Sequence, residues 1–512
     1  MSLLPGNVFI LRTRGFTGRA VEQATRYRNR AVVLILGLLA FRLLVLVLLP
    51  SGLHGDEAQY WAWAQALDWG YYSKPPMVAW VIAATTAVFG DAEWAVRLAS
   101  PMFHAGTAWL CFLSTRQLFG AQAGFWAAAL YILMPGVSLS SSIISTDAVL
   151  LFWVALAVYA WVRVRGGGGW MWTITLGAAV GLGLLSKYAM LFLLPALLFA
   201  ALLESRTRAA LLGTRGLVAA LTALLVVSPN LVWNARNDFA TVGHTGDNAN
   251  MGDGAGLYPA EWLEFFGSQF GVFGPITFAL LLVALLAVRR PASDAQRPAR
   301  RVLAVAVLTP LVVISVQALL SRANANWTAV AFGVAPVLLA GWAVLSPARM
   351  RVLAAGVALN AVLAVVPPLV LLSPSLTDEL GFANSVKRQR GWPQTVQLIE
   401  AELARGDYAA VAVDQRLLFY ALDYNGLDAA PLFIWRFEPR ITNHAEFTRA
   451  LPEGSEDVLL VSHFESYAPY FAADFDTLTP IATREVELGG GKVRRLRFYR
   501  ASGYNGPRER PD

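Results

Sequence analysis

The stretch Leu53-His54-Gly55-Asp56-Glu57-Ala58-Gln59-Tyr60-Trp61-Ala62-Trp63, followed by Tyr71-Tyr72-Ser73-Lys74-Pro75-Pro76, comes directly after a long apolar run at 31–50. A run of about 20 apolar residues is long enough to cross a bilayer as a helix. Two acids and a lysine therefore stand in an aromatic-rich loop against a membrane surface. Such a loop is typical of a reaction site.

The composition of the 512-residue chain indicates a membrane protein with many spans. Hydrophobic residues make up 56%, charged residues 15%, and the mean hydropathy is +0.51. These values exclude an ordinary soluble domain. The single cysteine, Cys111, excludes an intramolecular disulfide and a cysteine-based metal site. The net charge of +7 does not indicate nucleic-acid binding, because the basic residues lie mostly in short loops between apolar runs.

The apolar runs predict about 11 spans. The first, at 31–50, is too long for a signal peptide and is interpreted as a retained anchor. The others lie at 97–118, 124–138, 148–164, 170–185, 189–204, 216–232, 270–288, 302–320, 327–345 and 352–372. The shorter stretch 77–89 is predicted to be interfacial or re-entrant.

Basic residues orient these spans by the positive-inside rule. An arginine-rich segment at 1–30 places the N-terminus in the cytoplasm and the loop at 51–96 outside. With this parity the later arginine clusters all fall on the cytoplasmic side: Arg163/Arg165, Arg206/Arg208/Arg215, Arg289/Arg290/Arg297/Arg300/Arg301 and Arg349/Arg351.

From about residue 373 the apolar runs stop and a different pattern begins. The stretches 408–414, 457–462 and 493–499 are predicted strands, with helical stretches between them. We therefore expect an α-helical polytopic membrane domain at 31–372 and a small α/β extracytoplasmic domain at 373–512. The basic stretch Lys492 to Arg500 is interpreted as a solvated strand edge, with contact to anionic lipid as the alternative.

The predicted topology places several ionisable residues at the outer membrane face: His54, Asp56, Glu57, Lys74, Asp147, Lys187, His244 and Arg322. Ionisable groups near hydrocarbon are costly and usually pair with one another or line a pathway. Acids and cations gathered at one face therefore indicate a site for a phosphate-containing ligand.

Simpler interpretations exist for most of these residues. Asp56-x-x-Gln59 fits a capping box, and Asp147 fits a charge at a helix N-terminus. Lys187 can be explained as a lysine whose ammonium group extends to the membrane interface. His54 and His244 can be explained as hydrogen-bonded loop residues. Trp61, Trp63 and Trp69 fit an interfacial aromatic belt.

Four motifs resemble the family 39/83 GT-C glycosyltransferases: Gly55-Asp56-Glu57-Ala58-Gln59-Tyr60, Ser73-Lys74-Pro75-Pro76, Phe89-Gly90 with Arg97-Leu98-Ala99-Ser100, and Thr146-Asp147. This family includes the protein O-mannosyltransferases and the bacterial aminoarabinose and galacturonic acid lipid A transferases. Pro229-Asn230-Leu231-Val232-Trp233-Asn234 and Asn324-Ala325-Asn326-Trp327 are similar to a bacterial family 39 subgroup.

The resemblance implies a GT-C fold with about 11 to 13 membrane helices in the cell inner membrane. It implies an inverting transferase that takes a sugar from a polyprenyl-phosphate donor at the outer face. The acceptor is a lipid such as lipid A or lipopolysaccharide, a glycan or a protein, and a lipid is preferred on the bacterial resemblance. The sequence does not determine the sugar.

The resemblance also assigns roles to residues of this chain. Asp56 matches the first-loop acid and would act as the base, Asp147 matches the second acid, and Lys74 matches the lysine that meets the donor phosphate. Lys187 and Arg322 would stabilise the leaving phosphate. The remaining expected substrate-binding residues are Glu57, Tyr60, Arg97 and His244. Ser73 stands where related enzymes commonly carry a glutamate that helps to bind a metal, so a metal-independent reaction with no cofactor is expected.

Two other classes of function remain open at this stage. A lipid-linked-sugar flippase or transporter would be expected to spread its charges through the bilayer midplane rather than at one face. A non-catalytic membrane scaffold would not need an acid and a lysine in one loop at the membrane surface.

Overall fold

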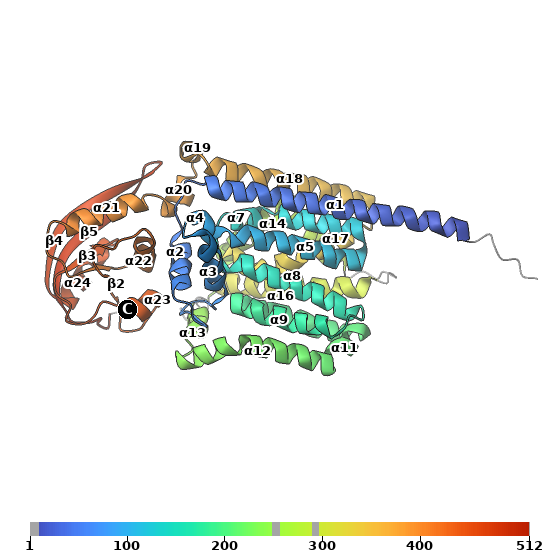
Figure 1. Cartoon of the computed structure of the whole chain (residues 1–512), viewed down its shortest axis with the longest axis horizontal. Helices are drawn as coiled ribbons and strands as arrows, with labels where there is room; N and C mark the ends of the chain where they lie inside the picture. Colours follow the sequence, from blue (N-terminus) through green and yellow to red (C-terminus); the bar gives the residue numbers. More distant parts are fainter. Residues whose placement is uncertain (1–9, 248–255, 289–295, 511–512) are drawn as a thin grey trace, which may run out of the picture.

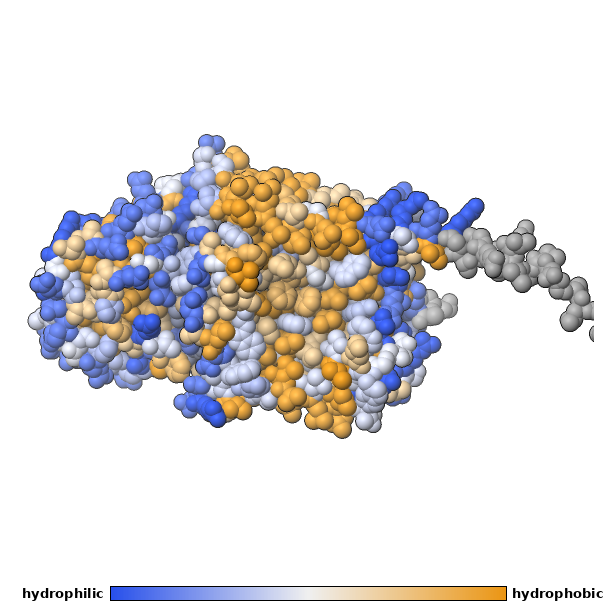
Figure 2. Space-filling view, viewed as in Figure 1, coloured by the Kyte–Doolittle hydropathy of each residue, from blue (hydrophilic) through white to orange (hydrophobic). Residues whose placement is uncertain are grey.

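A computed structural model describes residues 10–247, 256–288 and 296–510 of the chain. It consists of a helical bundle with a smaller sheet-containing domain at one end (Figure 1). The long helices of the bundle run side by side, and an apolar belt covers their outer surface between two polar ends (Figure 2). This arrangement is that of a multi-span membrane protein.

Within the described residues, six stretches are long and apolar enough to cross a membrane, and a seventh is possible if a bent pair counts as one. They lie in α1, α8, α12, α16, η2 with α17, and α18. The bundle helices are α1 (Ile10–Leu48), α5 (Ala99–Phe119), α6 (Ala121–Ile132), α7 (Pro135–Ser140), α8 (Thr146–Arg165), α9 (Trp170–Ser186), η1 (Tyr188–Phe192), α10 (Leu193–Leu203), α11 (Ser205–Leu211), α12 (Thr214–Arg236), α14 (Pro259–Phe273), α15 (Pro275–Ala287), α16 (Arg297–Leu320), η2 (Ala325–Thr328), α17 (Ala329–Ala343) and α18 (Pro347–Leu371).

Two of the spans expected from the sequence are broken in the structure. The stretch 270–288 crosses a bend of 108° between α14 and α15. The bend is at Gly274, whose φ of +99° favours glycine and whose missing side chain leaves space for Asn360. The stretch 124–138 is divided between α6 and α7, because Pro135 begins a new helix. A continuous apolar run therefore does not guarantee a continuous helix.

The first outer loop folds into three short helices, α2 (Gly55–Gln65), α3 (Met77–Phe89) and α4 (Glu93–Arg97). They lie between the bundle and the smaller domain, and α2 and α3 run across the direction of the long helices (Figure 1). This orientation agrees with an interfacial position for 77–89. The short helix α13 (Ala240–Asp247) lies at the same end of the bundle.

The smaller domain is an α/β unit with a five-stranded sheet in the order β2-β1-β3-β5-β4. Strand β1 pairs in parallel with β2 and β3, whereas β5 is antiparallel to both β3 and β4. Its elements, with the connection to α18, are α19 (Pro374–Glu379), α20 (Ala383–Val386), η3 (Lys387–Gln389), α21 (Trp392–Leu403), β1 (Ala410–Val413), α22 (Arg416–Tyr424), β2 (Leu432–Ile434), α23 (His444–Arg449), β3 (Val458–Ser462), η4 (Glu465–Tyr467), α24 (Ala468–Asp474), β4 (Phe475–Gly489) and β5 (Lys492–Tyr504).

Three of these strands, β1, β3 and β5, are those predicted from the sequence, while β2 and β4 were not predicted. The interpretation of Lys492 to Arg500 as a strand edge is wrong, because β5 lies between β3 and β4. Its arginines are satisfied within the domain: Arg494 is buried against the ring of Trp392, and Arg497 pairs with Glu465.

The smaller domain and the first outer loop share one hydrophobic core. Leu53, Ala58 and Trp63 of the loop belong to the same buried cluster as Leu418 and Phe419 of α22. Helix α11, which carries Arg206 and Arg208, lies at the opposite end of the bundle (Figure 1). This separation agrees with the orientation inferred from the basic clusters, of which Arg289 and Arg290 lie outside the described residues.

Candidate functional site

Asp147 joins three parts of the chain at the end of the bundle that faces the smaller domain. It lies in the first turn of α8, where a negative charge is favoured by the helix dipole. Its Oδ1 accepts a hydrogen bond of 2.7 Å from Nζ of Lys187, the residue that ends α9. Its Oδ2 accepts one of 2.6 Å from Nδ2 of Asn326. The side chains of Asp147 and Lys187 are only 11% and 20% exposed, so this ion pair is held in a partly desolvated setting.

Asp56 lies in the first turn of α2 and is paired from the smaller domain. Its Oδ1 is 3.0 Å from Nη1 of Arg416, and the same Nη1 also donates to Oε1 of Gln59. His54 Nδ1 lies 3.6 Å from the other carboxylate oxygen, Oδ2. Burial alone would raise the pKa of Asp56, but the charges of Arg416 and His54 outweigh it and hold the pKa below its usual value. Asp56 is therefore ionised at neutral pH.

The sequence fits a capping box of Asp56 and Gln59, but in the structure His54 and Glu57 form the capping box of α2. His54 is the N-cap residue of α2, and its Nδ1 accepts from the backbone N of Asp56. The Glu57 carboxylate in turn accepts from the backbone N of His54 at 2.9 Å. Because capping falls to His54 and Glu57, the side chains of Asp56 and Gln59 are available for contacts with Arg416.

Lys74 is the one cation of this group for which the structure, in its described part, shows no ion pair or side-chain hydrogen bond. Its electrostatic neighbours are Lys187, Asp56, Asp147 and Arg416, which places it among both carboxylate pairs. Burial and the charge of Lys187 lower the pKa of Lys74 to about 8, against the opposing effect of the two acids. A partly desolvated ammonium without a protein counter-ion is suited to bind an anion.

Glu57 and Arg97 form a separate ion pair that holds the outer loop together. Arg97 donates through Nε and Nη2 to the two oxygens of Glu57, at 2.9 and 2.8 Å, and also to the carbonyl of Gly52. Besides Arg97 and the backbone N of His54, Glu57 accepts from the backbone N of Ile144, two residues before α8. Both side chains are at most 2% exposed. We therefore interpret Glu57 and Arg97 as positioning residues that orient α2 against α8.

The other residues expected from the sequence lie around this group. Tyr60 is buried in α2 next to Trp63, and Asp56 and Asp147 are among its electrostatic neighbours. His244 on α13 packs edge-on against Tyr72, and burial with the charges of Lys74 and Arg416 lowers the pKa of His244 to about 4. It is thus neutral at pH 7. Arg322 is exposed in the loop four residues before Asn326, and its part in the site stays a prediction.

Helix α12 holds the second half of the outer loop in place. Asn230 donates to the carbonyl of Trp69, and Trp233 donates to the Asp68 carboxylate at 2.6 Å. Tyr188, which follows Lys187, donates to Asn230 in turn. The Asn230 and Trp233 motif therefore connects the loop that carries Lys74 with the segment that carries Lys187.

The described residues contain no group of three or more His, Cys, Asp or Glu side chains arranged to hold a metal ion. Ser73 accepts a long hydrogen bond, 3.4 Å, from Gln59. Whether the reaction needs a metal stays a prediction from the sequence.

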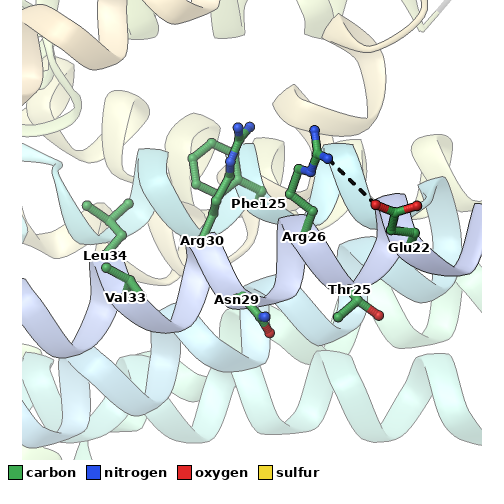
Figure 3. Close-up of a pocket in the computed structure, with 8 residues that line it drawn as sticks. All are labelled: Glu22, Thr25, Arg26, Asn29, Arg30, Val33, Leu34 and Phe125. Atoms are coloured by element: carbon green, nitrogen blue, oxygen red, sulfur yellow. Dashed lines mark ion pairs between the residues drawn. The ribbon is translucent and has the colours of Figure 1, made fainter.

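A groove of about 700 Å³ on the outside of α1 is remote from these charges. It is formed by residues between Glu22 and Leu34 in the middle of α1, together with Phe125. Its polar side chains include Arg26, which pairs with Glu22 at 3.9 Å (Figure 3). This part of α1 lies at the end of the bundle opposite the smaller domain (Figure 1). The groove therefore does not belong to the candidate site.

Two site residues were not predicted from the sequence, Arg416 and Asn326. Arg416 lies two residues after the predicted strand 408–414, and polar residues at the carboxyl end of a parallel strand are a known signal of a site. That signal does not reveal that Arg416 reaches Asp56, which lies 360 residues earlier. Asn326 was part of a quoted motif, but its contact with Asp147 depends on the packing of η2 against α8.

Sequence comparison relates the chain to lipid-linked sugar transferases. Residues 73–233, less than half of the chain, match the family described as dolichyl-phosphate-mannose-protein mannosyltransferase. Lipid A galacturonosyltransferase RgtD of Rhizobium johnstonii is 38% identical over 312 residues, which cover 61% of this chain and 64% of that protein. An undecaprenyl phosphate-alpha-4-amino-4-deoxy-L-arabinose arabinosyl transferase of Pseudomonas aeruginosa is 34% identical over 217 residues, 38% of each chain. The matches therefore span less than two thirds of these relatives.

Structural comparison extends the similarity to almost the whole chain. ArnT from Cupriavidus metallidurans, solved with bound undecaprenyl phosphate, superposes with a TM-score of 0.63. The match covers 93% of this chain and 99% of ArnT at 17% sequence identity. The bundle and the smaller domain thus share the fold of ArnT.

Proposed function

We propose that this chain is an inverting glycosyltransferase of the GT-C superfamily, on the premise of the fold that it shares with ArnT and of its sequence similarity to lipid-linked sugar transferases. It moves a sugar from a polyprenyl-phosphate donor to a lipid A-like acceptor at the outer face of the cytoplasmic membrane. The observation that carries this proposal is the position of Lys74, a cation without a described ion pair, between the Asp56–Arg416 and Asp147–Lys187 pairs. Three cations against two carboxylates leave one positive charge for an anionic donor.

Lys74 and Lys187 would bind the donor phosphate. As the bond between the sugar and the phosphate breaks, negative charge grows on the leaving polyprenyl phosphate. Preorganised cations in a partly desolvated site stabilise that charge more in the transition state than in the ground state. Asp147 keeps Lys187 in position at 2.7 Å.

Asp56 would act on the acceptor. Its carboxylate is ionised and accepts the proton of an attacking hydroxyl as a general base. A direct attack on the anomeric carbon needs no covalent sugar–enzyme intermediate and inverts the configuration. If the attacking group is already an anion, the same carboxylate orients the acceptor.

The proposed sugar is taken from the sugars named for the similar proteins. The longest similarity reported above is to a galacturonosyltransferase, and the shorter one is to an aminoarabinose transferase. We therefore propose a galacturonic acid donor, with aminoarabinose as the sugar to compare, and lipid A as the acceptor.

The test is mass spectrometry of lipid A and lipopolysaccharide from cells that express the wild type, Asp56→Asn or no protein. Only the wild type should add a uronic acid mass to lipid A. Asp56→Asn keeps the shape of the side chain, and loss of a general base typically costs a factor of 10² to 10⁴. Asp428→Asn, at an exposed acid of the smaller domain, is the matched control and should behave as the wild type. An Asp56→Asn profile equal to the wild type would remove Asp56 from the reaction.

A further inference from the structure

Arg416 reaches the site from the smaller domain and uses only part of its hydrogen-bonding capacity there. It is the first residue of α22, and its Nη1 makes both contacts, one with Asp56 and one with Gln59. Among the described residues no hydrogen bond is made by its Nε or Nη2. The side chain is 38% exposed and neither of these two donors is buried, so both are accessible to a ligand. A guanidinium edge of this kind matches two oxygens of one oxyanion.

The position of Arg416 is fixed by the packing of α22 on α2. A Cβ atom on Gly55 would lie 2.9 Å from the Leu417 side chain, so the absence of a side chain at Gly55 allows this close approach. Leu418 and Phe419 then enter the core shared with the outer loop. Moving α22 away from α2 would expose this core, so the backbone that carries Arg416 is held in place by packing.

The chemistry of the displacement places Arg416 on the acceptor side. In a direct displacement the leaving phosphate and the attacking group lie on opposite sides of the anomeric carbon. In the proposed reaction Lys74 and Lys187 serve the leaving phosphate and Asp56 acts on the attacking group, so a side chain bound to Asp56 lies beside the acceptor. This step depends on the proposed function.

We propose that Arg416 is an acceptor-binding residue, whose Nε and Nη2 hold a phosphate group of the acceptor lipid while Nη1 stays on Asp56. The arginine then lies between two anions that would otherwise repel each other, the Asp56 carboxylate and the acceptor phosphate. Asp56 stays ionised in this setting and cannot itself donate a hydrogen bond to a phosphate, so a bridging cation is needed. The smaller domain thereby contributes to acceptor recognition.

The kinetic test uses the full-length protein in detergent, undecaprenyl-phosphate-linked galacturonic acid as donor and lipid A that carries phosphate monoesters as acceptor. Arg416→Gln should raise the KM for lipid A about tenfold or more, since hydrogen bonds to a charged group are lost, and should not raise the KM for the donor, because loss of the Arg416 charge favours protonated Lys74. Arg416→Lys keeps the positive charge but lacks the two parallel N–H donors. Its KM for lipid A should lie between those of the wild type and Arg416→Gln. Arg495→Gln, an exposed arginine of the same domain, is the control.

Equilibrium binding separates this inference from the proposed function. The wild type should bind phosphorylated lipid A more tightly than the same lipid after phosphatase treatment, and Arg416→Gln should abolish the difference. If the preference persists in Arg416→Gln, or if that variant raises the donor KM instead, the assignment of Arg416 is wrong. If the wild type shows the preference but transfers no sugar, the proposed function fails and the binding role of Arg416 stands.

Discussion

At the scale of single residues, Lys74 differs from the other cations of the site. Lys187 and Arg416 each neutralise one carboxylate, whereas Lys74 has no ion pair in the described structure. Burial and the charge of Lys187 lower its pKa to about 8, which brings the loss of its proton close to physiological pH. Its charge is complete below this pKa and disappears above it.

This pKa predicts a pH-dependent donor affinity. The donor KM of the wild type should rise between about pH 7 and pH 9 as Lys74 loses its charge. Lys74→Arg, which stays protonated, should flatten this rise, and Lys74→Met should raise the donor KM at all pH values. The measurement is the donor KM from about pH 6 to pH 10 at constant ionic strength. The same rise in Lys74→Arg as in the wild type would assign the titration to another group.

At the scale of elements, the contact between α2 and α22 joins Asp56, the proposed base, to the smaller domain. The capping box of His54 and Glu57 begins α2, and the Glu57–Arg97 pair orients this helix against the bundle. Leu417 then packs over Gly55. The geometry at Asp56 therefore depends on helix packing as much as on the residues that touch it.

A substitution at Gly55 tests this dependence. Gly55→Ala should force α22 outward, because its Cβ would lie 2.9 Å from Leu417, and should lower stability by about 1 to 3 kcal/mol together with activity. Leu417→Ala in the same chain should restore part of the activity by making room. Thermal unfolding and transfer rates of the single and double variants measure this coupling.

The matched control is Gly267→Ala in α14, where a Cβ would meet nothing within 4 Å. It should keep full activity and gain slightly in helix stability. Equal activity in Gly55→Ala and the wild type would show that the α2–α22 contact does not position the site.

At the scale of the whole molecule, the candidate site and the smaller domain share one end of the bundle, and the arginines of α11 lie at the other. An apolar belt separates the two ends (Figure 2). Since basic residues favour the cytoplasmic side, the site is expected outside. A polyprenyl-linked donor on the outer leaflet would then reach Lys74 directly.

Thiol labelling tests this orientation. In a Cys111→Ala background, Arg495→Cys in the smaller domain should react with a membrane-impermeant reagent on intact spheroplasts, because that side chain is exposed. Arg206→Cys on α11 should react only after permeabilisation. The native Cys111 is buried, so the wild type serves as the unlabelled control. The reverse pattern would place the site in the cytoplasm and contradict an outer-face donor.

The sequence by itself determined the membrane class and three of the strands, and it predicted the domain boundary near 373 and the acids and lysines of the candidate site. These features follow from local quantities: the length of apolar runs, the alternation of basic loops and the cost of placing charge near hydrocarbon. Motif resemblance added the expected roles of Asp56, Lys74 and Asp147, which stay predictions.

Only the tertiary structure decided which charges meet. It paired Glu57 with Arg97 in the interior, gave Asp147 both Lys187 and Asn326, and brought Arg416 to Asp56 across 360 residues. It also showed the break at Gly274 within an apolar run. The physical reason is that contacts between distant segments depend on how helices pack, and packing leaves no periodic signal along the chain.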